Sequence, residues 1–306
     1  MTSNAMTGNG TTGNGTTGTV LVTGSRGRVG SALLDLLHRR NVPVRAASAS
    51  PADLTPPAGV EAVRCDLRDP ATFPAALDGV GAVFLYADPT HIDAFIARAR
   101  AAGVRHIVLL SSSAVLSPDA GANPIAAHHL AVERALAAAA AEGAFDVTYL
   151  QPGAFATNAL QWAPAIRAAG AVDLPYPRAA GDPLHERDLA DAAYAVLTDE
   201  RLRGASYVLS GPEVLTFAEQ LATIARVTGR EIRVGTVTPE AWKASVAPYL
   251  PAEFADALLD HWRTGAPESL PRPRTVEELT GRPARTFAQW AADHAAAFGG
   301  AGRAVA

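Results

Sequence analysis

The sequence is poor in several features that mark whole classes of protein. Its 306 residues include one cysteine, Cys65, which excludes a disulfide within the chain and suits a reducing cytoplasm. No apolar run reaches the roughly 18 residues that a membrane helix needs. The N-terminus has neither the basic start nor the apolar core of a signal peptide. A cytoplasmic protein without a membrane partner is therefore expected.

Charge is also sparse. Charged residues make up 18% of the chain, the formal net charge is -4 and the pI is near 6.1, which argues against nucleic acid as a partner. The histidines are scattered, and His128 and His129 would point to different sides of a helix, so no metal site is expected. The length suits one large α/β domain or a domain with an appendage, and 48% of the residues are hydrophobic.

The stretch Thr19–Gly30 carries the strongest signal. Its apolar run at residues 20–22 is typical of a buried parallel strand, and residues 31–37 place leucines on one helical face. Between these segments every third residue is a glycine: Gly24, Gly27 and Gly30. Strand, glycine turn and helix in this order predict dinucleotide binding at the helix N-terminus, with a turn that binds nothing as the alternative. The other turn residues expected to contact the cofactor are Ser25, Arg26, Arg28 and Val29.

The second predicted strand, residues 41–48, bears on the choice of cofactor. In this fold an acid at its end binds the ribose 2′-OH of NAD, whereas an Arg accepts the 2′-phosphate of NADP. The stretch contains no acid, whereas it contains Arg45, and Arg26 and Arg28 lie in the glycine turn. We therefore expect NADP(H) to be favoured over NAD(H). An ordinary solvated side chain is the alternative for each arginine.

Residues after the third predicted strand can contact adenine, because ligands bind at the carboxyl ends of strands in open α/β sheets. This strand lies within residues 60–67 and is followed by Asp66 and Leu67, which can flank the ring. Helix capping is the alternative for Asp66. Asp69 before Pro70 is better placed as a cap, so Asp66 stays a candidate for adenine.

Two more predicted strands end in side chains suited to nicotinamide or substrate. The strand at 81–86 ends at Tyr86, and His91 follows it. The strand at 106–110 is closed by the hydroxyls of Ser111–Ser113, which can donate to a carbonyl or a ribose, or else cap the next segment. A sixth strand is expected at 145–150. His185 directly precedes a helix and is expected to be structural.

The predicted organisation has three sections. Residues 1–18 contain a repeated Thr-Gly-Asn-Gly-Thr unit and predict a flexible leader. Residues 19–155 predict a Rossmann core that binds NAD(P), and residues 156–306 the remaining sheet elements, interleaved with that core, and a helical cap after about residue 235. Residues 174–177 are expected to form a loop. Helices are expected at 31–37, 92–102, 124–141, 160–169, 189–197, 216–227, 252–262 and 287–298. The fold class is α/β: a Rossmann-type doubly wound parallel sheet with a small, mostly helical C-terminal substrate domain.

Several motifs together resemble the NmrA-like branch of the atypical short-chain dehydrogenases/reductases. They are Val-Thr-Gly-Ser-Arg-Gly-Arg-Val-Gly at 22–30, Cys-Asp-Leu-Arg-Asp-Pro at 65–70, Ala-Gly-Val-Arg-His-Ile-Val-Leu-Leu-Ser-Ser-Ser at 102–113, Tyr-Leu-Gln-Pro-Gly-Ala-Phe-Ala-Thr-Asn at 149–158 and Thr-Gly-Arg-Pro-Ala-Arg-Thr-Phe at 280–287. The resemblance extends over nearly all of residues 19–298. It implies a Rossmann domain, an NAD(P) site and a small substrate domain. Members include NAD(P)H:quinone reductases, isoflavone-type reductases and redox-sensing regulators without catalysis.

The resemblance also implies roles for particular positions. The three glycines match the phosphate loop, and Asp66 with Leu67 matches the adenine contact. The strand exit near nicotinamide and the turn that borders it are matched by four residues: Ser111, Ser112, Pro152 and Gly153. One departure weakens the preference for NADP, since many relatives have a second basic residue where this chain has Ala49.

A second departure concerns catalysis. The Tyr-x-x-x-Lys pair of the wider superfamily is replaced, with Ile125 at the tyrosine position and His129 at the lysine position. His129 is then the titratable group at the expected catalytic spot, able to act as an acid or to orient a substrate oxygen. Ser112 and His91 are the other catalytic candidates. An ordinary helix residue is the alternative for His129.

We therefore expect an NAD(P)H-dependent oxidoreductase that reduces a quinone or a conjugated carbonyl, with secondary metabolism as one setting. A quinone needs less help with protonation because its dianion is comparatively stable. Two alternatives stay open: a non-catalytic NAD(P)-sensing regulator, and a non-redox tailoring enzyme such as a cyclase or epimerase on the same fold. The expected partner is a small-molecule substrate, and a homodimer is an alternative to a monomer.

Overall fold

The computed structural model describes residues 18–264 and 274–300, so nearly all of the expected leader lies outside the described residues. The larger part is a seven-stranded sheet in the order β3-β2-β1-β4-β5-β6-β9, in which every neighbouring pair is parallel. Its strands are β1 (Thr19–Val22), β2 (Val44–Ser48), β3 (Glu61–Arg64), β4 (Val80–Tyr86), β5 (His106–Leu110), β6 (Asp146–Pro152) and β9 (Ser206–Leu209). The strand order reverses between β1 and β4, which confirms the predicted doubly wound Rossmann type.

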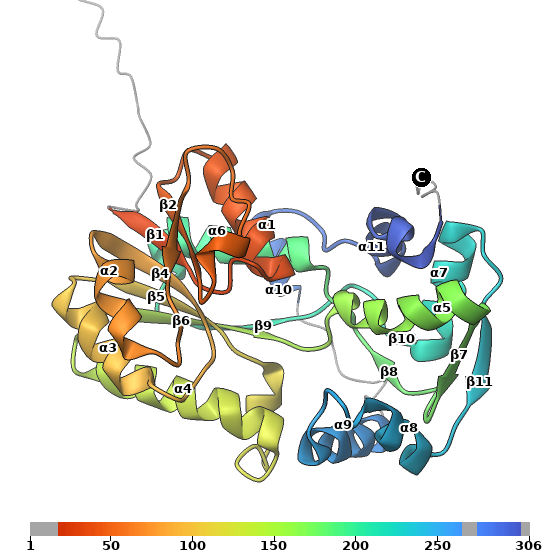
Figure 1. Ribbon diagram of the computed structural model, residues 1–306. Helices are drawn as coiled ribbons and strands as arrows, with labels where there is room; N and C mark the ends of the chain where they lie inside the picture. Colours follow the sequence, from red (N-terminus) through yellow and green to blue (C-terminus); the bar gives the residue numbers. More distant parts are fainter. Residues whose placement is uncertain (1–17, 265–273, 301–306) are drawn as a thin grey trace, which may run out of the picture.

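Helices cover both faces of this sheet (Figure 1). Successive side chains of a strand point to opposite faces, so Val20 packs on one face and Leu21 on the other. The face of Val20 is covered by α1 (Arg28–Arg39) and α6 (Glu186–Thr198). The face of Leu21 is covered by α2 (Phe73–Leu77), α3 (Ile92–Ala101) and α4 (Pro124–Ala141). The observed bounds of α4 are those predicted from the sequence.

A smaller part lies beyond the carboxyl end of β6, on the right of Figure 1. Its helices are η4 (Ala156–Trp162), α5 (Ala163–Ala169), α7 (Phe217–Thr228), α8 (Pro239–Val246), α9 (Ala252–Thr264), α11 (Phe287–Asp293) and η6 (Ala295–Phe298). Its strands form two short pairs: β7 (Ala171–Leu174) with β11 (Arg233–Thr236), and β8 (Ala180–Gly181) with β10 (Leu215–Thr216). This part is mostly helical, as predicted, but the four short strands were not expected.

Aromatic side chains join the helices of the smaller part. Trp162, Phe217, Trp262 and Trp242 form a series of edge-to-face contacts with ring centroids 5.7, 5.4 and 4.9 Å apart. Such contacts stabilise a core beyond the burial of apolar area alone. They connect α8 and α9 to the core formed by η4 and α7.

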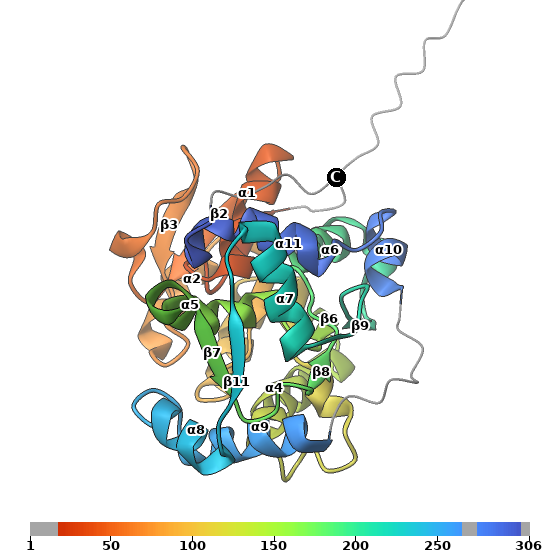
Figure 2. The ribbon, with the colours of Figure 1, turned by 90° about the vertical axis from the view of Figure 1, so that its right-hand side faces the viewer.

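The C-terminal segment, residues 274–300, returns to the larger part before it ends. We call it the strap. It begins with α10 (Thr275–Thr280), which packs beside α6, and continues into α11, which packs on α7 (Figure 2). The strap therefore touches both parts, a course that the predicted helical cap after about residue 235 did not specify.

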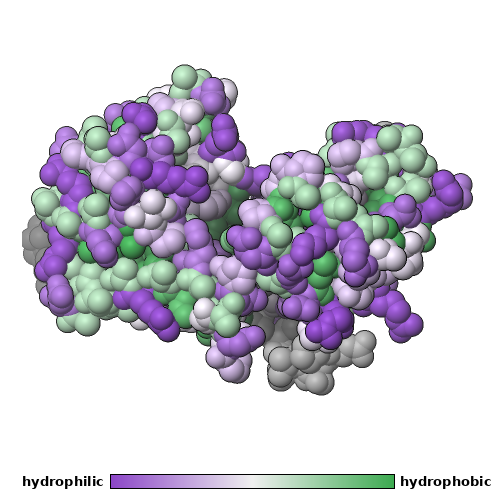
Figure 3. Space-filling view, turned by 60° about the horizontal axis from the view of Figure 1, so that its bottom comes forward, coloured by the Kyte–Doolittle hydropathy of each residue, from purple (hydrophilic) through white to green (hydrophobic). Residues whose placement is uncertain are grey.

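The surface is hollowed where the two parts meet (Figure 3). This is the carboxyl edge of the sheet, because β6 leads directly from it into the smaller part. A bridge between Phe155 and Leu184 ties the exit of β6 to the segment before α6. Across the two described ranges, no helix combines the length and the apolar character needed to cross a membrane.

Candidate functional site

The glycine turn joins β1 to α1 at the carboxyl edge of the sheet. Gly24 has a φ of +62°, a conformation that side chains disfavour. A Cβ on Gly30 would lie 2.5 Å from the carbonyl oxygen of Gly24, so only glycine lets the first turn of α1 pack against the loop. Gly27 is the residue before α1, and no side chain of the described structure caps that helix. The N–H groups of the first turn can therefore serve a ligand.

Two of the predicted contacts in this turn have side chains turned inward. Ser25 is 3% exposed, its hydroxyl donates to the carbonyl of Val22 (2.7 Å) and it accepts from the N–H of Ala47 (3.0 Å). The Ser25 N–H donates to the Ala47 carbonyl as well (3.1 Å). Val29 is 6% exposed and packs in the core beneath α1. Ser25 thus holds the loop against β2 with both its hydroxyl and its N–H, whereas Val29 leaves its backbone for a cofactor.

Tyr86, at the end of β4, lies directly against the glycine turn. A Cβ on Gly24 would come within 2.6 Å of its ring, and one on Gly27 within 3.2 Å of its hydroxyl. Burial raises the pKa of Tyr86, and a hydrogen bond from the Gly30 N–H partly offsets that rise. The phenol therefore stays protonated and lines the turn, next to the helix N-terminus.

The arginine predicted in β2 is engaged elsewhere. Arg45 pairs with Leu21 in the register of the sheet, well before the carboxyl end of its strand. Its Nε lies 2.7 Å from Glu61, and its Nη1 donates to the carbonyls of Ala76 and Asp78 at 3.1 and 2.8 Å. These contacts hold the guanidinium away from the carboxyl edge of the sheet, where a ribose would bind. They argue against the predicted role of Arg45 in cofactor binding.

A cavity of about 180 Å³ opens beside the glycine turn instead. It is lined by Arg26 of the turn, by Asp35 of α1 and by residues 53–57 after β2. Arg26 Nη1 lies 3.6 Å from the carboxylate of Asp53 across this cavity. Sequence reasoning missed Asp53, because it examined only the strand end for an acid. The short turn that begins at Pro51 was the available signal.

Two acids follow β3, Asp66 and Asp69, and the structure separates the capping role from the candidate adenine contact. Asp69 caps the turn η2 (Pro70–Thr72) by accepting from the N–H of Ala71 (3.2 Å), which confirms the predicted cap. Asp66 is half-buried, and its Oδ1 accepts from the N–H of Arg68 (3.0 Å). Leu67 beside it is half-buried too. Both stay candidates for the adenine contact.

The exits of β5 and β6 lie side by side. The N–H of Ser111 donates to the carbonyl of Leu150 (2.8 Å), and Pro152 is the last residue of β6. Ser111 is 3% exposed, and among the described residues its hydroxyl has no hydrogen-bond partner. Ser112 accepts from the N–H of Ala114 (3.2 Å), which leaves its own proton free to donate. The fold thus brings these predicted residues together.

Gly153 completes this end of the site. A Cβ there would lie 3.2 Å from Oδ1 of Asp182 and 3.6 Å from Oγ of Ser113, so the turn passes close to two polar groups. The N–H of Gly153 donates to the carbonyl of Leu209 (3.1 Å), which fixes the turn on β9. Asp182 lies 29 residues further along the chain, and no motif in the sequence pointed to it.

Helix α4 places its histidines at the same edge. His128 Nε2 lies 3.1 Å from the carbonyl of Ala87, in the segment between β4 and His91. One turn after His129, Glu133 accepts from Nε2 of Gln151 in β6 (2.9 Å). His91 precedes α3 and forms no capping bond in the described structure. The helix is therefore tied to the exits of both β4 and β6.

Burial changes what His129 can do. Desolvation, and to a smaller extent the charge of His128, lowers the pKa of His129 to about 4. The imidazole is then neutral near pH 7, so the predicted role as a charged acid does not fit its surroundings. A neutral ring can still donate one N–H and orient a substrate oxygen. Its Nδ1 is buried and unpartnered among the described residues.

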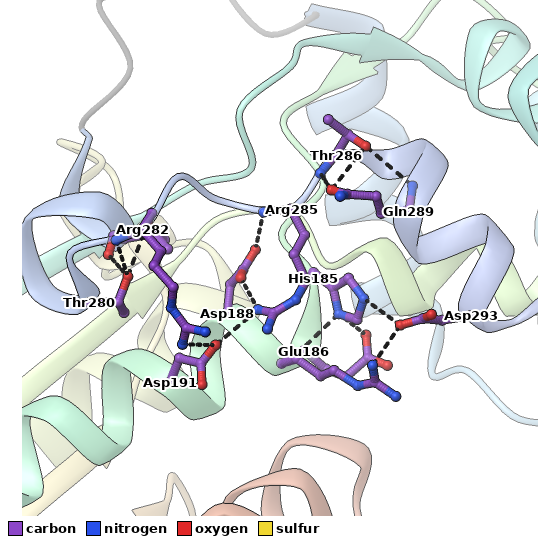
Figure 4. Close-up of polar contacts among 12 residues, drawn as sticks. His185, Glu186, Asp188, Asp191, Thr280, Arg282, Arg285, Thr286, Gln289 and Asp293 are labelled. Atoms are coloured by element: carbon purple, nitrogen blue, oxygen red, sulfur yellow. Dashed lines mark hydrogen bonds and ion pairs between the residues drawn. The ribbon is translucent and has the colours of Figure 1, made fainter. Parts of the chain in front are cut away.

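A second polar network joins α6 to the strap (Figure 4). Arg285 is ion-paired with Asp188 and lies 2.9 Å from Asp191, and its N–H donates to Asp188 (2.7 Å). His294 Nε2 lies 2.6 Å from Glu186. These groups bind one another rather than facing the cleft. In the described ranges no three histidine, cysteine or acidic side chains are grouped to hold a metal ion.

His185 has the structural role that its sequence position predicted. Its Nδ1 accepts from the N–H of Arg187 (3.2 Å) at the start of α6, and its Nε2 lies 3.4 Å from Asp293 of the strap. The side chain is 1% exposed. It therefore caps the helix and faces the strap.

Comparison with known proteins agrees with this architecture. A sequence model of the NmrA-like family matches residues 16–266. The chain is 41% identical to the (4-alkanoyl-5-oxo-2,5-dihydrofuran-3-yl)methyl phosphate reductase of Streptomyces griseus, covering 91% of this chain and 99% of the relative. It is 34% identical to the NAD(P)H azoreductase of Xenophilus azovorans, covering 92% and 100%.

A solved structure gives the same result. The NADPH-dependent quinone oxidoreductase of Escherichia coli superposes with a TM-score of 0.72 and 25% identity, covering 90% of this chain and 98% of that one. The match of the family model and the two relatives confirm the resemblance found in the sequence. This chain belongs to the NmrA-like family.

Proposed function

We propose that the chain is an NAD(P)H-dependent reductase that delivers hydride to a quinone or another conjugated acceptor. The observation that carries the proposal is the uncapped N-terminus of α1 behind the glycine turn, in a chain similar over nearly its whole length to two named reductases. A bound reduced nicotinamide supplies the hydride. The residues of the chain bind and orient both reactants and stabilise the charge that develops on the acceptor.

The cofactor is proposed to lie along the carboxyl edge of the sheet. Its pyrophosphate binds at the uncapped start of α1 beside the glycine turn, where the helix dipole favours an anion. Asp66 and Leu67 hold the adenine, and Tyr86 lines the path between the two ends. The nicotinamide end borders Ser111 and the Pro152–Gly153 turn. We favour NADP(H), with Arg26 rather than Arg45 as the group that receives the 2′-phosphate.

Ser112 and His129 are proposed to stabilise the reduced acceptor. Hydride transfer leaves negative charge on an acceptor oxygen or nitrogen, and the free O–H of Ser112 and the N–H of a neutral His129 can donate to it. His91 stays a weaker candidate. The single lysine of the sequence, Lys243, lies in α8 and pairs with Asp256 (2.6 Å). A site without a Tyr-x-x-x-Lys pair favours acceptors whose reduced anions are stable and take protons from solvent.

The test combines binding with turnover. Calorimetric titration with NADPH and NADH is followed by oxidation of the reduced cofactor at 340 nm with a quinone, an unsaturated lactone and an azo dye. We expect binding of NADPH and steady oxidation with at least one acceptor. Failure to bind either cofactor would overturn the proposal. Binding without turnover on a broad panel would favour the regulator, and product without a change at 340 nm the non-redox enzyme.

A pair of variants tests the site itself. Ser112→Ala should lower kcat about tenfold while leaving the Kd of NADPH unchanged, because one hydrogen bond to the transition state is lost. Ser117→Ala, an exposed serine in the same loop, should leave kcat unchanged. Equal kcat in both variants would remove Ser112 from the mechanism.

A further inference from the structure

We propose that Asp53 sets the choice between the two nicotinamide cofactors by competing with a ribose 2′-phosphate for Arg26. The inference rests on the proposed function and adds a specificity residue to it. An acid at the end of β2 is the feature that the sequence lacks. Asp53, five residues after the end of β2, lies beside that strand end.

The turn after β2 fixes the position of Asp53. The N–H of Ser50 donates to the hydroxyl of Ser48 (3.1 Å), and the N–H of Asp53 donates to the carbonyl of Ser50 (3.1 Å). Pro51 opens the short helix η1 (Pro51–Asp53), and its restricted φ stiffens that turn. Asp53 is therefore held beside the strand end by backbone geometry.

The glycine turn fixes Arg26 on the opposite wall. Ser25 makes two hydrogen bonds to Ala47, one residue before the end of β2, so the neighbouring Arg26 starts from a rigid base. The Arg26 guanidinium and the Asp53 carboxylate approach to 3.6 Å across the cavity. This cavity adjoins the glycine turn and residues 53–57 after β2. The adenosine ribose of a dinucleotide lies near the end of that strand.

The ion pair between Arg26 and Asp53 is weak enough for a ligand to break it. The side chains of Arg26 and Asp53 are 71% and 60% exposed, so solvent screens their attraction. A phosphate monoester carries more charge than one carboxylate and can take Arg26 from it, but Asp53 then repels the phosphate. A ribose hydroxyl carries no charge and can instead donate to Asp53. Asp53 thus reduces the preference for NADPH that Arg26 provides, and it tolerates NADH.

The experiment measures the Kd of NADPH and of NADH for the wild type and for Asp53→Asn, Arg26→Ala and the double variant. Asp53→Asn should tighten NADPH about fivefold, the effect of an exposed charge pair, without tightening NADH. Arg26→Ala should weaken NADPH about tenfold and leave NADH nearly unchanged. In the Arg26→Ala background the effect of Asp53→Asn should largely disappear.

Asp35→Asn is the matched control, because Asp35 lines the same cavity from α1 and pairs with no arginine in the described structure. It should change the NADPH to NADH ratio less than Asp53→Asn does. Equal effects of the two variants, or an Asp53→Asn effect that persists in full without Arg26, would overturn the inference. If the wild type binds neither cofactor, the proposed function itself fails; an unchanged ratio with both cofactors bound refutes only the role of Asp53.

Discussion

The glycine turn and the strap are positioned by opposite means. The turn is a contiguous stretch whose shape comes from backbone conformation, above all from Gly24 and Gly30, and much of it is exposed. The strap is positioned by charged side chains that meet α6 across about a hundred residues of sequence, and Asp188 is 3% exposed at their centre. One region is specified by neighbours along the chain, the other by partners that only the fold brings together.

The glycine turn therefore concerns cofactor binding, whereas the strap concerns the stability of the folded molecule. A change in the turn should act on the cofactor with a local cost in stability. A change in the strap should act on the stability of the whole molecule, because the strap touches both parts. The four predictions below follow this division from the largest expected effect to the smallest.

Arg285→Ala should lower the free energy of unfolding by about 3 kcal/mol. The substitution leaves the buried carboxylate of Asp188 with only the backbone N–H of residue 285 as a partner from the strap. Urea unfolding followed by tryptophan fluorescence measures the loss. Arg282→Ala is the control, since Arg282 is 61% exposed and should cost under about 1 kcal/mol. Equal costs would mean that burial of the pair does not matter.

Gly30→Ala should cost about 2 kcal/mol through overpacking and should also weaken NADPH at least about tenfold. The added Cβ would lie 2.5 Å from the Gly24 carbonyl, so α1 must shift away from the turn. Gly121→Ala, where a Cβ meets nothing within 4 Å, should change neither quantity. Normal NADPH binding by Gly30→Ala would contradict the role assigned to the turn.

Glu186→Gln should cost about 1.5 kcal/mol at pH 7 and progressively less in acid. Burial raises the pKa of Glu186, but the imidazoles of His185 and His294 beside it outweigh burial and hold that pKa below its ordinary value of 4.5. The unfolded chain therefore binds this proton before the folded protein does, and the stabilisation present above about pH 4.5 is lost as the pH falls. Unfolding from pH 7 to 3.5 measures it.

The control for that prediction is Glu200→Gln, which removes an exposed carboxylate paired with Arg203. Its cost should be small and should change little over the same range of pH. A difference between wild type and Glu186→Gln that grows as the pH falls would show that the sign assigned to Glu186 is wrong.

Arg187→Ala should have the smallest effect, at most about 0.5 kcal/mol. Arg187 lies 2.8 Å from Asp293 of the strap, but its side chain is 58% exposed and water screens the pair. The cost should shrink further in 1 M salt, which shortens the range of electrostatic interactions. A loss above about 1 kcal/mol in thermal unfolding would place this exposed pair among the principal contacts of the strap.

The sequence predicted the regions that neighbouring residues determine. The order of strand, glycine turn and helix needs only adjacent residues. The start of α4 follows from Asn123-Pro124, and the cap at Asp69 follows from Asp69-Pro70. The paired strands β7, β8, β10 and β11 were missed because two to four residues carry no readable period. No local pattern indicates that the side chain of Arg45 is engaged elsewhere, because its partners Glu61, Ala76 and Asp78 lie on later segments.

The residues of the candidate site were likewise predictable only where the local sequence determines their positions. The sequence predicted Ser111 and Ser112 just after one strand and Pro152 and Gly153 just after the next, and both pairs lie at the carboxyl ends of β5 and β6. Asp53 was missed although Pro51 marks the turn that brings it back, and Asp182 reaches the site through a crossing that carries no local pattern. The neutral state of His129 depends on burial beneath neighbouring segments, which no spacing within α4 reveals.

The position of Arg285 has a consequence for the growing chain on the ribosome. Asp188 is synthesised 97 residues before the arginine that neutralises it. At about 5 to 20 residues per second, the carboxylate waits roughly 5 to 20 s for that partner. Through this interval α6 can add its apolar face to the sheet while a charge destined for burial stays in water. The strap is thus made well after the part of the molecule that it completes.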